Sequence, residues 1–144
     1  MVPEPRPTPD RLTGGAPGPA RPATTRERPS TGVLVVHLHV DLDHLTCELV
    51  QAQVEAELAR TPTCRLILDL TDADALAAAG IRMLLHLWRL CRHRDITLVL
   101  VGTGHHGVHV PLRCSGVLPL FDTRPSVLHA LPAPSLTAAR GGTR

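Results

Sequence analysis

The feature that most constrains the fold is an alternation of short apolar runs with longer segments of helical periodicity. Residues 32–40, 65–70 and 95–102 are short and rich in Val, Ile and Leu, so each run predicts a β-strand. The run RLILDL at 65–70 is compact and apolar, which is typical of a strand buried on both faces. Helical segments separate the runs. This order predicts an α/β fold in which crossover helices cover a sheet of about four or five strands.

The first helical segment runs from about Asp43 or His44 to Arg60. The short acidic side chain of Asp43 is well placed to cap the free amides at the helix start. The apolar residues recur at helical spacing in one set, with a second set beside it: Leu42, Leu45, Leu49, Ala52 and Ala56, then Val50, Val54 and Leu58.

The second helical segment, at about 78–93, also carries two apolar sets. The first set forms one stripe and contains Ile81, Leu84, Leu85, Trp88 and Cys91. The second set, Met83, Leu87 and Leu90, does not lie on that stripe. It indicates either a broad buried face or an apolar surface that contacts a partner.

The C-terminal third of the chain predicts smaller elements. A short helix is expected near 110–114, where Pro111 fits the first turn but not the interior. Residues 117–121 predict a short edge strand, because Pro119 cannot take part in a central ladder. A last helix is expected at about 124–131.

The two ends of the chain have the composition of disordered tails. Residues 1–31 are crowded with Pro, Gly, Thr and Arg, and their few apolar residues show no helical or strand spacing. Such a segment cannot repay the entropy of ordering, and the same holds for residues 132–144. We therefore expect one folded domain at 32–131, with no secretory signal because residues 1–31 hold no continuous apolar core.

Composition argues against several functional classes. The net charge is only +2, and no basic stripe with interleaved aromatic residues is present, so nucleic-acid binding is not expected. No apolar run approaches the length of a membrane span. The four cysteines are well separated in sequence and are expected to be buried free thiols of a cytoplasmic protein: Cys47, Cys64, Cys91 and Cys114.

Four segments in order resemble the STAS domain of anti-sigma factor antagonists. DLDH at 41–44 resembles the family's Gly-Glu-Leu-Asp turn, with Val40 in place of the glycine and Asp41 in place of the glutamate. The other matching segments are LILDLT (66–71), LAAAGIRMLL (76–85), and LVLVG followed by SGVLPLF (98–121). The resemblance covers about 32–131 and implies a STAS-like α/β fold, with a mixed sheet packed against about four helices.

The resemblance also implies a function that this chain would carry out in an altered form. In the family, an anti-sigma factor with kinase activity phosphorylates the first serine of an Asp-Ser-Ser-Gly turn, and the unphosphorylated protein binds that anti-sigma factor and frees a sigma factor. Here Ala77, Ala78 and Ala79 stand at the Asp-Ser-Ser positions, and Gly80 alone matches. Alanine accepts no phosphate, so Ala78 would be a phosphosite equivalent that cannot be switched.

The partner-binding residues implied by the resemblance lie around this turn and the 41–44 turn. They are Asp41, Asp43, Ala77, Ala78, Ala79, Gly80, Arg82 and Met83. The expected partner is an anti-sigma factor or serine-protein kinase. For Asp41 and Asp43, a helix cap and an exposed turn charge are an equal alternative. Asp69, at the end of the 65–70 strand, is expected to accept hydrogen bonds from loop amides.

Loss of the serine also affects the helix start. Replacing a capping serine by alanine costs about 1 kcal/mol. Asp74 is an alternative cap, so the helix is expected to begin early or to fray around 77–79, with Gly80 tolerated inside it.

No enzyme, cofactor or metal is expected. The chain has no signature of a Ser-His-Asp or Cys-His set. Asp72 and Asp74 could form a carboxylate pair for acid–base chemistry, but they are expected to cap a surface turn or to face solvent. His105 and His109 have the spacing of two ligands on a helix, but no Glu or Cys follows at a ligand distance. Two alternatives to the antagonist remain: a scaffold or homo-oligomer subunit of a sensory complex, and a ligand- or metal-binding regulator using His105, His106 and His109.

Overall fold

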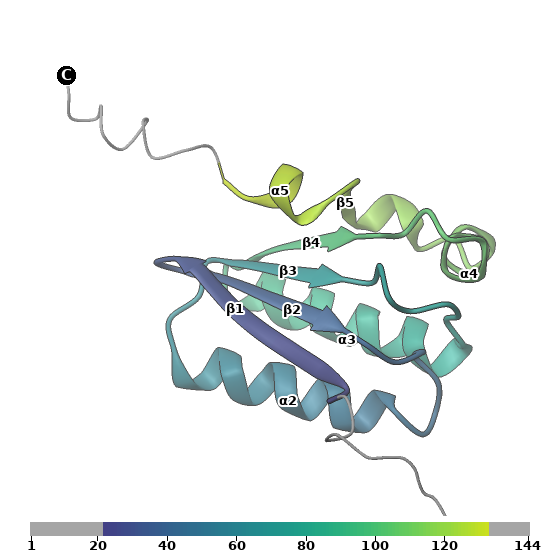
Figure 1. The fold of residues 1–144 in the computed structure, drawn as a ribbon, viewed down its shortest axis with the longest axis horizontal. Coiled ribbons are helices and arrows are strands. Elements are labelled where there is room, and N and C mark those ends of the chain that lie inside the picture. Colours follow the sequence, from purple (N-terminus) through teal and green to yellow (C-terminus); the bar gives the residue numbers. More distant parts are fainter. Residues whose placement is uncertain (1–21, 133–144) are drawn as a thin grey trace, which may run out of the picture.

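A computed structural model describes residues 22–132, and the expectations for residues 1–21 and 133–144 lie outside this range. One five-stranded sheet, in the order β1-β2-β3-β4-β5, forms the centre of the molecule. Helices α2 and α3 cover one face of the sheet, and α5 lies over the other face near β4 (Figure 1). The predicted α/β architecture is confirmed.

The elements alternate along the chain as the apolar runs predicted. They are β1 (Thr24–Ser30), β2 (Val33–Leu38), α2 (Cys47–Arg60), β3 (Arg65–Asp69), α3 (Ala78–His93), β4 (Thr97–Val101), α4 (His106–Cys114), a 3-10 helix (Leu118–Leu120), β5 (Asp122–Arg124) and α5 (Val127–Ala130). Strands β2 to β5 run parallel, and β1 is antiparallel to β2 at one edge.

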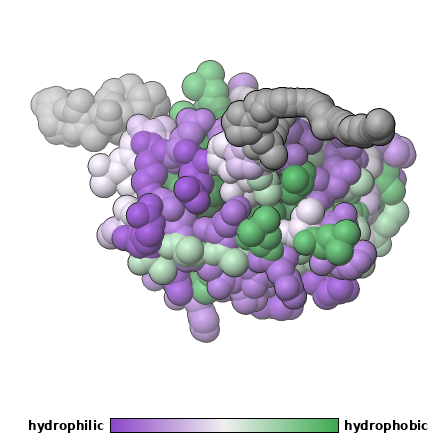
Figure 2. All heavy atoms as spheres, turned by 60° about the horizontal axis from the view of Figure 1, so that its bottom comes forward, coloured by the Kyte–Doolittle hydropathy of each residue, from purple (hydrophilic) through white to green (hydrophobic). Residues whose placement is uncertain are grey.

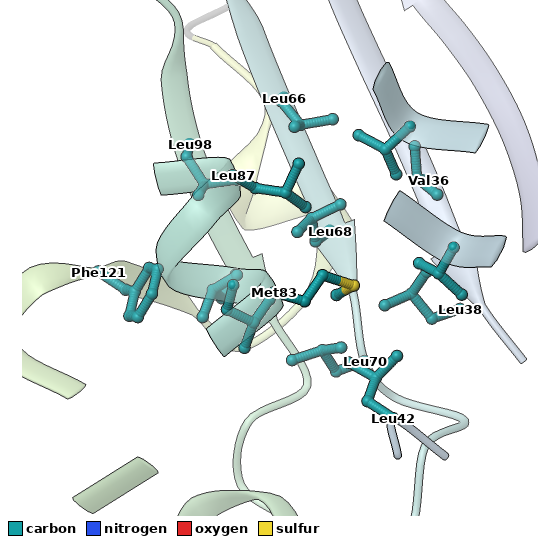
Figure 3. Close-up of a cluster of buried hydrophobic side chains, with 14 of the residues drawn as sticks. Val36, Leu38, Leu42, Leu66, Leu68, Leu70, Met83, Leu87, Leu98 and Phe121 are labelled. Carbon is teal, nitrogen blue, oxygen red and sulfur yellow. The ribbon is translucent and has the colours of Figure 1, made fainter. Parts of the chain in front are cut away.

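The main core cluster lies between the sheet and helices α2 and α3. Val36 and Leu38 of β2 point into this cluster, where Met83 and Leu87 of α3 pack against β3 (Figure 3). The alternate side chains of the same strands form a second cluster with α5: Val33, Val35, Ile67, Val99, Val101 and Ala130. Both faces of the inner strands are therefore buried, which explains their continuous apolar sequence.

Strand β1 lies in a segment that the sequence predicted to be a disordered tail, so this part of the prediction is wrong. The strand has the sequence TTRERPS, and its one nonpolar side chain, Pro29, is exposed. It is held by its backbone ladder with β2 and by polar side-chain contacts, with Thr24 as its one buried residue. Reasoning from buried apolar surface could not detect such a strand.

Two further predictions near the C-terminus are wrong in position. Residues 117–121 contain a 3-10 helix with Pro119 in its first turn, and the edge strand is β5, which pairs Asp122 with Val99. The last helix is limited to Val127–Ala130. Proline favours a helical first turn, and only Phe121 of the 117–121 run is buried.

Helix α4 is longer than predicted and contains both Gly107 and Pro111 in its interior. Pro111 has no N–H to donate to the carbonyl of Gly107. That carbonyl instead accepts a hydrogen bond from the Leu76 amide at 3.1 Å. A Cβ on Gly107 would lie 2.0 Å from the Asp74 carbonyl oxygen, so glycine permits this close approach.

The helix faces differ from the predicted stripes. In α3, Met83 and Leu87 are buried, so the broad buried face is confirmed for them, while Leu90 is half-buried. In α2, the buried residues include Val50, Val54 and Leu58. In the other set, Leu42 is buried in the loop before α2, but the remaining residues face outward: Leu45 is 77% exposed, Leu49 is 51% exposed, and Ala52 and Ala56 are also exposed.

Within residues 22–132, no helix is long and apolar enough to cross a membrane. Cys47 and Cys91 are buried free thiols as expected, but Cys64 and Cys114 are exposed. Burial raises the pKa of the Cys91 thiol to about 11.

Candidate functional site

The candidate site lies where the chain leaves the carboxyl ends of β2, β3 and β4. The loop after β2 contacts the loop before α3 through backbone hydrogen bonds. The Leu42 amide donates to the Ala75 carbonyl at 3.2 Å, and the Ala77 amide donates to the Leu42 carbonyl at 2.8 Å. Leu42 and Leu76 thus form a short parallel bridge that fixes the approach to α3.

Helix α3 begins at Ala78, so the expectation of an earlier start with Asp74 as the cap is wrong. Ala77 is the N-cap residue, with extended dihedral angles (φ −86°, ψ 174°), and no side chain caps the helix. The backbone pairing with Leu42 holds residues 75–77 extended, so they cannot join the helix. Ala77 and Ala78 are exposed, and this uncapped end presents first-turn amides and the positive end of the helix dipole.

Asp41 organises the loop that precedes α3. Its Oδ1 atom accepts hydrogen bonds from the Asp74 amide at 2.7 Å and the Ala75 amide at 3.2 Å. The side chain is exposed, so Asp41 both orders this loop and places a carboxylate on the surface beside Ala77. Asp74 therefore serves as a donor to Asp41 through its backbone.

Asp43 caps the turn that leads into α2, as expected, although the helix itself begins at Cys47. Its Oδ1 atom accepts hydrogen bonds from the amides of Leu45 at 2.8 Å and Thr46 at 3.1 Å. These two bonds hold the pKa of Asp43 below its usual value. The turn presents Leu45 outward next to the acidic side chains.

Gly80 lies where α3 packs most closely against the Leu42 loop, and no larger residue fits there. A Cβ on Gly80 would lie 2.8 Å from the Leu42 Cβ and 2.9 Å from the Leu42 carbonyl oxygen. Gly80 is buried, so it positions the exposed alanines and cannot contact a partner through a side chain. The sequence predicted only that Gly80 would be tolerated inside the helix, whereas the structure shows that this position has no room for a side chain.

A third loop, after β4, completes the site. Gly102 has φ +79°, and a Cβ there would lie 2.5 Å from the Thr71 amide nitrogen. His105 Nε2 lies 2.7 Å from the Thr71 carbonyl oxygen. The sequence did not indicate this contact, which holds the β4–α4 loop against the β3–α3 loop.

Asp69 accepts hydrogen bonds from the loop, as expected, and also contacts β2. Its Oδ1 atom accepts the Thr71 amide at 3.0 Å, and its Oδ2 atom lies 2.7 Å from His37 Nδ1. Burial alone would raise the pKa of Asp69, but the hydrogen bonds from Thr71 and His37 outweigh burial and lower it. Asp69 is therefore an ionised anchor of the loop.

A shallow hollow of about 320 Å³ lies between the first turns of α2 and α3. Its lining residues are His44, Cys47, Glu48, Gln51, Ala79, Arg82, Met83 and His86. Arg82 is exposed at its rim, whereas Met83 is only 3% exposed and belongs to the core. Met83 therefore forms part of the floor, and its predicted role as a surface contact is wrong.

Two exposed apolar residues lie at the start of α2, Leu45 in the turn before the helix and Leu49 in its first turn, and neither lines the hollow. The α2 side of the molecule is mainly polar with separate apolar patches (Figure 2). Among residues 22–132, the large apolar side chains with the greatest exposure are Leu45, Leu49, Leu120 and Leu128. Two of these four thus lie at the start of α2.

The histidine segment does not form a metal site in the described part of the chain. Between residues 22 and 132, no group of three or more His, Cys, Asp or Glu side chains is placed to hold a metal ion. His105 and His106 are exposed and His109 is half-buried, and His105 contacts the Thr71 carbonyl as described above.

A family model of the STAS domain matches residues 23–130, so the chain belongs to the STAS domain family. This match begins at β1 and ends at α5, which agrees with the described fold.

Individual relatives are anti-sigma factor antagonists. The chain is 25% identical over 103 residues to the anti-sigma F factor antagonist of Paenibacillus polymyxa, covering 69% of this chain and 87% of that protein. A crystal structure of an anti-sigma factor antagonist from Mycobacterium paratuberculosis superposes with a TM-score of 0.61 at 24% identity, covering 81% of this chain and 92% of that one. The anti-sigma factor antagonist SpoIIAA in its unphosphorylated form superposes with a TM-score of 0.61 at 16% identity, covering 85% and 98%.

Proposed function

We propose that this chain is an anti-sigma factor antagonist: it binds an anti-sigma factor, of the serine-protein kinase class, and so frees a sigma factor. The observation that carries the proposal is the exposed, uncapped start of α3 at Ala77 and Ala78, which continues into the α2–α3 hollow through Ala79 and Arg82. Membership of the STAS family and similarity to an anti-sigma F factor antagonist support it.

This surface suits a protein partner better than a small ligand. The hollow is shallow and open, and its lining includes the charged side chains of Glu48 and Arg82. Leu45 and Leu49 add exposed apolar side chains at the start of α2. Apolar side chains surrounded by charged ones are typical of protein-binding surfaces. The residues that would contact the partner are therefore Asp41, Asp43, Ala77, Ala78, Ala79 and Arg82, with Gly80 and Met83 supporting them from below.

The proposed antagonist differs from a switchable one at Ala78. A phosphate at the first turn of α3 would face free amides and add nearly two negative charges to the binding surface. The Ala78 methyl group cannot receive it. Binding would then be constitutive, and the amount of this protein would set the amount of free sigma factor.

The experiment is calorimetric titration of the full chain with each kinase-type anti-sigma factor of its organism, first with ADP and then with ATP. Binding that persists with ATP supports a constitutive antagonist. Leu45→Ser should weaken that binding at least tenfold. Leu128→Ser is the matched control, because Leu128 is equally exposed, at 76%, but lies on α5 over the opposite face of the sheet.

A homo-oligomer or scaffold is the second candidate, since Leu45 and Leu49 are also available for self-association. Sedimentation of the same preparation distinguishes the two. A stable assembly that fails to bind any of the anti-sigma factors would contradict the antagonist and favour the scaffold.

A further inference from the structure

Strand β1 is attached to the domain almost entirely by charged and polar groups. Its one nonpolar side chain, Pro29, is exposed, and its ladder with β2 is irregular between Glu27 and Ser30. A strand that buries no apolar side chain gains little from the hydrophobic effect. The attachment of β1 therefore depends on polar side-chain contacts to a greater extent than the attachment of the inner strands.

On the α2 side, β1 is held by one acidic residue. Glu57 of α2 is 6% exposed and lies 3.7 Å from Arg26 Nε and 3.5 Å from Arg28 Nε. Thr24 adds a hydrogen bond to Gln53 of α2 at 2.6 Å. Because Glu57 also pairs with Arg60, its charge remains balanced if β1 leaves.

On the opposite face, β1 is held by a histidine placed between two carboxylates. His37 of β2 lies 2.7 Å from Glu27 of β1 through Nε2 and 2.7 Å from Asp69 of β3 through Nδ1. Carboxylates only accept hydrogen bonds, so both contacts require an N–H on each ring nitrogen. A neutral imidazole has one N–H and can serve only one of the two carboxylates.

We propose that β1 is a releasable edge strand whose attachment to β2 depends on the doubly protonated form of His37. In this form the ring bridges β1 to β3 across β2. When the ring loses a proton, Asp69 retains the better contact because it also receives hydrogen bonds from Thr71 and is the less exposed carboxylate. The Glu27 contact is then lost, and β1 loses its main anchor on this face.

The surroundings of His37 agree with this assignment. Burial by itself lowers the pKa of His37, but the hydrogen bonds from its ring to Asp69 and Glu27 outweigh burial, so the pKa is raised from 6.5. The ionisable groups near His37 on this face include His39, whose ring stacks on His37 with centroids 6.4 Å apart, and Asp72, which pairs with His39 at 2.9 Å. Arg65 of β3 lies farther along the same face and donates to the Ala130 carbonyl. His39 also contacts Thr25 of β1 at 2.8 Å.

The sign of the pH dependence follows from the raised pKa. Attachment of β1 is strongest below the unfolded value of 6.5 and weakens as the pH rises through the higher value of the folded state. Release would uncover the backbone edge of β2, from Val33 to Leu38, which can then pair with another strand. This device lies away from the α2–α3 hollow and does not depend on the partner proposed above.

The test is hydrogen exchange of the full chain, measured by mass spectrometry between pH 5.5 and 8.5, with labelling times corrected for intrinsic exchange. Protection of β1 amides should fall about tenfold for each unit by which the pKa is raised, while β4 amides stay unchanged. His37→Gln should show the low protection at every pH. If the protection of the β1 amides in the unmodified chain does not change with pH, the proposal is overturned.

Two variants separate the role of His37 from general damage. His86→Gln removes a histidine that pairs with Glu55 at 2.7 Å between α2 and α3, so it should leave the β1 profile unchanged. Glu27→Gln alters only an exposed side chain and should move the His37 titration, followed by NMR, to lower pH. An unchanged His37 titration in Glu27→Gln would also overturn the proposal.

Discussion

The Asp41 carboxylate accepts a hydrogen bond from the Asp74 amide at 2.7 Å, so a side chain from the loop after β2 fixes the loop before α3. The same Oδ1 atom accepts the Ala75 amide. Asp41→Ala should therefore destabilise the fold by about 1 kcal/mol, because two amides lose a charged acceptor. Urea unfolding measures this loss. Asp41→Asn retains one oxygen acceptor and should cost clearly less; equal losses would mean that the hydrogen bonds are unimportant.

Gly80 lies too close to Leu42 to carry a side chain. Its added Cβ would meet the Leu42 carbonyl oxygen at 2.9 Å, and a backbone atom cannot move aside as a side chain can. Gly80→Ala should destabilise the protein by about 1–3 kcal/mol despite the better helix propensity of alanine. Gly104→Ala is the control, since nothing lies within 4 Å of its added Cβ, and thermal unfolding compares the two. A more stable Gly80→Ala protein would contradict the contact.

The start of α3 can accept a cap that the sequence does not supply. Ala77 has the extended dihedral angles of an N-cap residue and no side-chain acceptor. Ala77→Ser should therefore stabilise the protein by about 1 kcal/mol, measured by thermal unfolding. Ala75→Ser serves as the control, because Ala75 lies in the extended segment before the helix and its change should have little effect.

The parts of the fold that could be predicted from the sequence are those in which burial and periodicity agree. The RLILDL run predicts a strand because it is compact and apolar, and β3 is buried on both faces as expected. Apolar residues spaced three or four apart predict a helix at about 78–93, which matches α3. In α2 both sets of residues are apolar, so the pattern could not show that Leu45 and Leu49 face outward. The packing of Val50 and Val54 against the sheet decides that choice.

The remaining features depend on contacts between distant segments. The interior position of Pro111 in α4 is stable because the Leu76 amide satisfies the Gly107 carbonyl, and no local pattern indicates that pairing. Likewise, the start of α3 at Ala78 is set by the backbone of Leu42. β1 was missed because its anchors, such as Glu57 and His37, lie on other elements.

Glu57 provides the last prediction, which concerns acid stability. It is the one buried acidic residue between residues 22 and 132, and burial by itself raises its pKa. The Arg60, Arg26 and Arg28 guanidinium groups outweigh burial and lower the pKa below 4.5. Because the folded-state pKa is lowered, the stabilisation is present above pH 4.5 and is lost as the pH falls through the folded value.

Glu57→Gln should therefore destabilise the protein at pH 7 by about 1–3 kcal/mol, since Arg26 and Arg28 lose their shared anion. The difference from the unmodified chain should shrink as the pH falls below 4.5, because protonation then neutralises Glu57 of the unmodified chain and makes it as uncharged as the glutamine of the variant. Urea unfolding from pH 3 to 7 measures it. Glu48→Gln is the control, because Glu48 is exposed on the same helix and makes none of these contacts with β1. A Glu57→Gln deficit of equal size at pH 3 and pH 7 would show that packing, and not the ion pairs with β1, determines the contribution of Glu57.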